Sequence, residues 1–146
     1  MNSSFNFDLF VSYSWSNKTL VHELCSLLEK KGYKLWLDKN EMKHGNINHL
    51  MKKGIDESEI FVCCATTNYC KSENALKEFN YAIARKKLII YIIFEIFNGE
   101  EDRLKKLDEI SFEFARQMYY KHDDLDGIVR TVEELKRVKI LIKFRF

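Results

Sequence analysis

Proline is absent from this 146-residue chain, and glycine occurs only five times. Pro-rich linkers, collagen-like repeats and low-complexity segments are therefore excluded. An excess of one charge is also lacking, because 24 Lys and Arg nearly balance 22 Asp and Glu. This balance gives no reason to expect a nucleic-acid partner. Apolar residues, at 46%, suffice for a sizeable core, so we expect a single globular domain.

Several signature motifs are missing as well. Residues 12–17, which end the first predicted strand and lead into the loop after it, contain no glycine, so the dinucleotide-binding fingerprint and the P-loop are excluded. The same segment lacks the acidic pair of a phosphoacceptor receiver domain. The G-x-S-x-G elbow of serine hydrolases is also absent. No C-x-x-C pair occurs, and we therefore expect no zinc site.

Targeting segments are equally scarce. No secretory n-region and h-region opens the sequence. The most apolar stretch, residues 88–97, includes Glu95 and is too short to cross a bilayer, so no membrane span is expected. We expect a cytoplasmic protein whose cysteines are reduced and mostly buried. These cysteines are Cys25, Cys63, Cys64 and Cys70.

Apolar runs and helical patterns alternate along the chain. Runs rich in β-formers predict strands at 7–13, 33–37, 60–65, 88–94 and 117–121. Helical spacing predicts helices at 18–31, 47–55, 73–86, 100–109 and from 125, with a polar loop over 66–72. This alternation favours an α/β, flavodoxin-like, doubly wound sheet of roughly five parallel strands with helices on both faces. The domain would span residues 5–138, and the basic and apolar tail 139–146 has no assigned place.

The helices are expected to bury their apolar stripes against the sheet. The predicted inner residues are Leu20, Leu24, Leu27 and Leu28 in the first helix; Ile47, Leu50 and Met51 in the second; Leu76, Phe79, Ala82 and Ile83 in the third; and Leu125, Ile128, Val132 and Leu135 in the last.

Two carboxylates fall where such a sheet binds ligands, beyond the carboxyl ends of its strands. Asp38 ends the second predicted strand, and Glu78 lies in the helix after the third. Glu78 falls at the border of its helix's apolar stripe, beside two small alanines that leave room for a ligand. Spacing alone nevertheless favours a solvated helix glutamate. Trp15, in the first loop, is as typical of a cover over the sheet end as of a residue that stacks on a base.

Three segments, taken together and in order, resemble the Toll/interleukin receptor (TIR) domain. They are residues 7–15 (FDLFVSYSW), residues 32–38 (GYKLWLD) with the loop to 45, and residues 69–79, where Glu78 follows Ser72 by six positions. The resemblance covers about residues 5–94 and continues more loosely to 136. It implies the flavodoxin-like fold already predicted and is closest to the stand-alone type of TIR domain.

The resemblance also implies a function. Many TIR domains cleave NAD+ at the nicotinamide–ribose bond with the glutamate that falls here on Glu78. Nicotinamide and linear or cyclic ADP-ribose would be the products, in defence or signalling, with NAD+ as substrate and no cofactor or metal. The resemblance places a set of residues around the substrate: Tyr13, Ser14, Trp15, Asp38, Ile47 and Asn74. Asn74 stands where NAD+-cleaving members often have an aromatic residue.

TIR domains also associate with one another. The resemblance therefore implies a homo-oligomer in which a neighbouring protomer completes the NAD+ site. Two alternatives stay open. One is a non-catalytic TIR scaffold that recruits other TIR domains. The other is nucleoside 2-deoxyribosyl transfer, which shares this type of fold and a catalytic glutamate.

Overall fold

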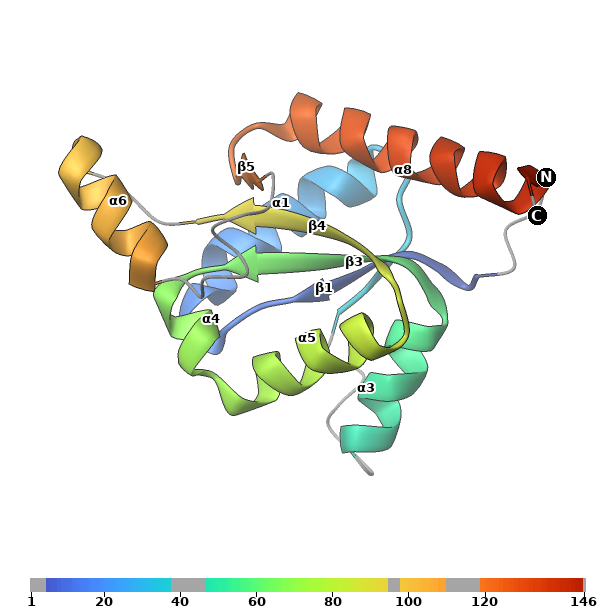
Figure 1. Ribbon diagram of the computed structural model, residues 1–146, viewed down its shortest axis with the longest axis horizontal. Coiled ribbons are helices and arrows are strands. Elements are labelled where there is room, and N and C mark those ends of the chain that lie inside the picture. Colours follow the sequence, from blue (N-terminus) through green and yellow to red (C-terminus); the bar gives the residue numbers. More distant parts are fainter. Residues whose placement is uncertain (1–4, 38–46, 95–97, 110–118, 146) are drawn as a thin grey trace.

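The computed structural model describes residues 5–37, 47–94, 98–109 and 119–145 (Figure 1). Its centre is one sheet of five parallel strands in the order β2-β1-β3-β4-β5. This is the flavodoxin-like order, and it reverses between β1 and β3. The strands are β1 (Phe7–Ser12), β2 (Leu35–Trp36), β3 (Ser58–Ala65), β4 (Leu88–Ile93) and β5 (Tyr119–Lys121). The predicted fold class is confirmed.

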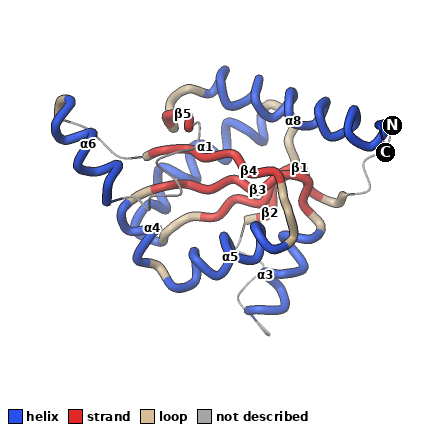
Figure 2. The backbone as a smooth tube through the Cα atoms, viewed as in Figure 1, coloured by secondary structure: helices blue, strands red, loops and turns tan. Residues whose placement is uncertain are grey.

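Helices cover both faces of this sheet, and Figure 2 shows α1 and α8 on one side and α3 and α5 on the other. The helical elements are η1 (Trp15–Asn17), α1 (Lys18–Lys30), α3 (Ile47–Asp56), α4 (Thr67–Lys71), α5 (Glu73–Ala84), α6 (Glu100–Glu109) and α8 (Leu125–Arg145). None of the described helices is long and apolar enough to span a bilayer.

The sheet separates two cores, because successive side chains of a strand point to opposite faces. On the α1/α8 face, Leu9 and Val11 of β1 pack with residues of α1 and α8. On the α3/α5 face, Phe10 packs with residues of α3, α4 and α5. Cys64 lies in the first core and the adjacent Cys63 in the second. A buried parallel sheet of this kind explains why β3 is a continuous apolar run.

Two predicted inner residues are wrong. Leu27 of α1 and Ile83 of α5 are 43% and 51% exposed. Each helix instead buries positions i, i+3, i+4 and i+7, the stripe that a helix packed on a sheet presents. These positions are Val21, Leu24, Cys25 and Leu28 in α1, and Ala75, Glu78, Phe79 and Ala82 in α5. The predicted inner faces omitted Cys25 and Glu78, which both belong to the buried stripes.

The other helices agree better with their predicted faces. In α8, Ile128 and Val132 are buried, and Leu125 and Leu135 pack against the same core. In α3, Met51 and Ile55 are buried, while the side chain of Ile47 lies outside the described residues.

Segment 66–72, predicted as a loop, contains the short helix α4. Thr66 caps it, since its Oγ1 accepts a hydrogen bond from the Tyr69 amide at 3.0 Å. Ser72 ends α4 and caps α5, accepting from the Ala75 amide at 3.2 Å. The last predicted element also differs, because the backbone of α8 continues as helix through the tail to Arg145.

Candidate active site

Glu78 is buried. It lies in the second turn of α5, within the stripe that packs on the sheet, and only 6% of its surface is exposed. The solvated glutamate that spacing alone favoured is therefore wrong. A carboxylate withdrawn from water is costly unless other groups compensate for the lost hydration. Its position therefore requires an explanation that helix propensity and packing do not supply.

A small polar cluster lies beside Glu78, between the carboxyl-terminal parts of β1 and β3. Ser12 and Cys63 face each other across these strands as register partners. The Tyr69 hydroxyl, from α4, lies 2.7 Å from the Ser12 Oγ and is also hydrogen-bonded to the Cys63 thiol. Ser12, Cys63 and Tyr69 are all fully buried, so these hydroxyl and thiol groups depend on one another for hydrogen bonds.

The cluster is held in its neutral form. Burial raises the pKa of Tyr69, and the nearby Cys63 and Glu78 raise it further. Burial likewise raises the pKa of the Cys63 and Cys64 thiols, and Glu78 adds to both shifts. Protonated thiols are poor nucleophiles. In this cluster the Tyr69 phenol and the Cys63 thiol therefore act as hydrogen-bonding groups, whereas Cys64 faces the other core.

The loop after β1 joins α4 through hydroxyl groups. Ser14 is buried, and its Oγ lies 3.0 Å from the Ser16 Oγ. Asn68 of α4 donates to the same Ser16 Oγ at 3.1 Å. At the start of α1, the Asn17 Nδ2 is buried and has no hydrogen-bond partner among the described residues. Ser14 is thus held on the same side of the molecule as α4.

The other predicted site residues are more scattered. Tyr13 is buried in the core of the α1/α8 face, where its hydroxyl is hydrogen-bonded to His22 Nε2 at 3.3 Å. The sheet therefore lies between the Tyr13 side chain and Glu78. Trp15 is 65% exposed, with Lys18 Nζ 5.0 Å from the centre of its ring. Asn74 is exposed on α5, one turn before Glu78. Asp38 and the side chain of Ile47 lie outside the described residues.

Sequence reasoning missed the three residues of the buried polar cluster: Ser12, Cys63 and Tyr69. Ser12 carries a usable signal, since it is a hydroxyl that follows the apolar run Leu9–Val11 of β1. Tyr69 was hidden because its segment was predicted as a loop, where a tyrosine has no assigned neighbour.

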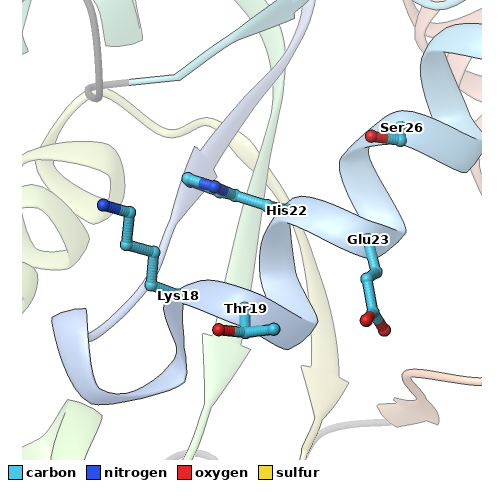
Figure 3. A pocket seen from close by; sticks show the side chains of 5 residues that line it. All are labelled: Lys18, Thr19, His22, Glu23 and Ser26. Atoms are coloured by element: carbon cyan, nitrogen blue, oxygen red, sulfur yellow. The ribbon is translucent and has the colours of Figure 1, made fainter.

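A surface hollow of about 520 Å³ lies along α1, away from Glu78. All five residues that line it belong to this one helix: Lys18, Thr19, His22, Glu23 and Ser26 (Figure 3). Because α1 covers the opposite face of the sheet from α5, this hollow is separate from the Glu78 cluster. In the described part of the chain, no three His, Cys, Asp or Glu side chains are grouped closely enough to hold a metal ion.

Comparison with solved structures shows the same fold in TIR domains. The TIR domain of the Toll-related receptor TRR-2 from Hydra magnipapillata has a TM-score of 0.69 at 14% identity, covering 88% of this chain and 99% of that one. The TIR domains of the activated Roq1 resistosome, which recognises the pathogen effector XopQ, give 0.58 at 22% identity, with 90% and 98% covered. The Clostridium botulinum CMP N-glycosidase BcmB gives 0.51 at 19% identity, with 86% and 98% covered.

At these identities the structural likenesses establish the fold alone. A search of curated proteins gave no match. The sequence model of the TIR domain, however, matches residues 9–129, which is most of the chain and includes β3, α4, α5 and the last four residues of β1. The chain belongs to the TIR domain family.

Proposed function

We propose that this TIR domain is an NAD+ nucleosidase, which releases nicotinamide from NAD+ and leaves ADP-ribose, linear or cyclic, as a signal. The observation that carries the proposal is the burial of Glu78, 6% exposed, in α5, which follows the carboxyl end of β3 through the short helix α4. In doubly wound sheets, ligands bind at the carboxyl ends of the strands, near the point where the strand order reverses.

One carboxylate is sufficient for this chemistry. The pyridinium nitrogen of NAD+ is cationic, so nicotinamide departs as a neutral molecule and needs no general acid. The ribose that remains develops positive charge in the transition state, as sugars do in glycoside hydrolysis. An anionic Glu78 stabilises this charge, or accepts a hydrogen bond from a ribose hydroxyl.

The surroundings of Glu78 strengthen this effect. Electrostatic attraction is greater in a medium of low dielectric constant than in water. The neutral Tyr69, Cys63 and Cys64 carry no charge that would compete for the carboxylate. A positive charge that forms beside Glu78 therefore meets an opposite charge weakly screened by solvent.

The remaining site residues are assigned by position. Ser14 and Trp15 follow β1 directly, and Asn74 lies on the same helix as Glu78. We place the substrate between these two elements. Tyr13 contributes through its backbone, because its side chain lies on the opposite face of the sheet. Asp38 and Ile47 complete the proposed set.

The proposal includes assembly. The Roq1 TIR domains were solved within an activated resistosome, and the RPS4 and RRS1 TIR domains as a heterodimer. We propose that protomers of this chain associate and that a neighbour completes the NAD+ site. The specific rate of nicotinamide release then rises with protein concentration.

The test compares two glutamates of the same helix. The purified protein is incubated with NAD+, and nicotinamide is followed by chromatography. Glu78→Gln should lower the rate by at least about a hundredfold, because the transition-state charge loses its partner. Glu73→Gln is the matched control, since the Glu73 side chain is 86% exposed and its ion pair with Lys77 lies on the surface. This control should retain the parent rate.

Three other results would replace the proposal. Release of cytosine from CMP, without loss of NAD+, would assign the chain to nucleotide N-glycosidases, in line with the fold it shares with BcmB. Base exchange on deoxynucleosides would indicate deoxyribosyl transfer. No turnover of any of these substrates at high protein concentration would leave a TIR scaffold.

A further inference from the structure

Tyr69 has the largest side chain among the fully buried residues, yet it carries a polar hydroxyl. A phenylalanine at this position would fill the same core without withdrawing a hydroxyl from water, which is costly unless a hydrogen bond replaces the hydration. Three other rings of the same core, Phe10, Phe61 and Phe79, carry no hydroxyl. The hydroxyl of Tyr69 therefore has a purpose other than packing.

That hydroxyl connects a helix to two strands. It lies 2.7 Å from Ser12 Oγ at the end of β1 and is hydrogen-bonded to Cys63 of β3. Ser12 and Tyr69 are separated by 57 positions in the sequence, so this is a tertiary contact. It fixes α4 on the sheet next to the point where the strand order reverses.

No loop separates α4 from α5, so the position of α4 determines where α5 begins. Ser72 is at once the residue that ends α4 and the residue that caps α5, so α5 starts where α4 stops. Glu78 follows within two turns of this cap. Glu78 belongs to the buried stripe of α5, and its stripe neighbours Ala75 and Phe79 pack in the same core as Tyr69.

We propose that Tyr69 is a positioning residue for Glu78, and that its hydrogen bond to Ser12 holds α4 and the start of α5 in the one arrangement that presents the carboxylate to the substrate. This inference rests on the proposed function. Small displacements of a catalytic group are costly, because the reacting atoms must approach within narrow limits. Loss of the Tyr69 hydroxyl should therefore act on the chemical step more than on substrate binding.

The experiment measures kcat and KM for nicotinamide release in Tyr69→Phe, Ser12→Ala and the double variant. Each single variant should lower kcat by about tenfold and leave KM within about twofold of the parent. The double variant should be no slower than Tyr69→Phe, because both changes remove the same hydrogen bond. Rates are compared at a temperature where circular dichroism shows every variant fully folded. Ser12→Ala serves alone if Tyr69→Phe does not fold.

Tyr81→Phe is the matched control. Tyr81 lies on α5, and its hydroxyl donates to Asp56 Oδ2 at 2.8 Å, far along the helix from the cap at Ser72. This variant also loses one hydroxyl and one hydrogen bond, but it should retain the parent kcat. A parent-like kcat in both Tyr69→Phe and Ser12→Ala, or an equal loss in Tyr81→Phe, would overturn the inference.

A second readout separates this inference from the proposed function. The Glu78 carboxyl carbon is followed by ¹³C NMR through a pH titration, with its signal assigned by its absence in Glu78→Gln. Its titration midpoint should differ between the parent and Tyr69→Phe, and be the same in the parent and Tyr81→Phe. If the parent releases no nicotinamide, the proposed function fails, and an unchanged Glu78 titration in Tyr69→Phe then also overturns the inference.

Discussion

The two faces of the sheet are built from different side chains. The α1/α8 face is mostly aliphatic, with Leu9, Val11, Ile60, Val62 and Ile92 from the strands. The α3/α5 face is richer in aromatic side chains. There the Phe10 ring stacks on Trp36 at 4.6 Å and on Phe61 at 5.5 Å, and Phe79 contacts both Phe61 and Tyr91.

The faces also differ in where their polar groups lie. On the α1/α8 face, Lys136 of α8 forms ion pairs with Asp8 and Glu59 at the margin of the core. On the α3/α5 face, Ser12, Tyr69 and Glu78 are themselves buried. Buried polar groups lower stability unless every one is satisfied, so proteins retain them where they serve a function. The comparison indicates that the first face mainly stabilises the domain, whereas the second also holds the residues of the proposed site.

The largest effect on stability is expected from the aromatic core. Phe61→Ala removes a fully buried ring that stacks on Phe10 and contacts Phe79, and should cost about 3–5 kcal/mol of unfolding free energy. Its chain neighbour Ile60 points to the other face, and Ile60→Val should cost only about 0.5–1.5 kcal/mol. Urea unfolding measures both. A Phe61→Ala cost no greater than that of Ile60→Val would contradict the importance of the aromatic packing.

A smaller loss is expected where α3 approaches the aromatic core most closely. A Cβ at Gly54 would lie 2.6 Å from Trp36 Cε2, which is a steric clash. Gly54→Ala should therefore lower stability by about 1–2 kcal/mol, although alanine is the better helix former. In a Trp36→Leu background the clash is removed, and the same change should become neutral or stabilising. A cost that is equal in the two backgrounds, measured by urea unfolding, would show that the indole is not the obstacle.

The fold was predictable from the sequence because the central strands of the sheet are short, continuous apolar runs. The central strands are buried on both faces, and the runs at β1, β3 and β4 therefore stand out from the surrounding polar segments. Exact burial within helices was less predictable. In α5 the stripe includes Glu78, and a charged residue in a buried position looks like a surface residue until the tertiary structure is known.

The site was predictable only in part, for a similar reason. Glu78 was predicted as a site residue from the resemblance to TIR domains, and Ser14 is buried and linked through Ser16 to Asn68 of α4. Tyr13 did not meet Glu78, since the alternation of β1 sends its side chain to the opposite face. Ser12, the residue before it, points to the site instead. The hydrogen bond between Ser12 and Tyr69 joins segments 57 positions apart, and no local pattern reveals such a contact.

The ion pairs of Lys136 with Asp8 and Glu59, at the margin of the α1/α8 core, should contribute about 1 kcal/mol to the free energy of unfolding. Lys136 Nζ lies 2.6 Å from Asp8 Oδ1, and Lys136→Met removes this pair. Partial burial lowers the pKa of Lys136, but the hydrogen bond and charge of Asp8, with Glu59 and Glu133, outweigh it and raise the pKa above its usual value. The contribution is thus fully present below the unfolded pKa of about 10.5 and is lost as the pH rises through the higher folded value.

Urea unfolding of the parent and Lys136→Met from pH 8 to 11 measures this dependence. The difference in stability should be constant to about pH 10 and shrink above it. The pKa of Tyr33 is raised as well, first through burial and then through its hydrogen bond to Glu133. Its contribution to the stability of the domain is therefore also lost as the pH rises. The same comparison is therefore repeated in a Tyr33→Phe background, where the pH dependence that remains in the difference comes from Lys136. A difference that stays constant to pH 11 would contradict the assignment to Lys136.

The smallest effect on stability is expected at Trp15, where a change should instead alter substrate binding. Its ring is 65% exposed and contacts Lys18 Nζ at 5.0 Å, an interaction worth about 0.5 kcal/mol at an exposed site. Trp15→Ala should therefore leave urea unfolding almost unchanged. If the indole contacts NAD+, KM should rise severalfold while kcat changes little, since a contact made equally in the ground and transition states affects binding alone. Trp15→Phe keeps an aromatic surface and should recover most of the binding. An unchanged KM in Trp15→Ala would remove Trp15 from the site and leave Ser14 as the proposed contact from the segment after β1.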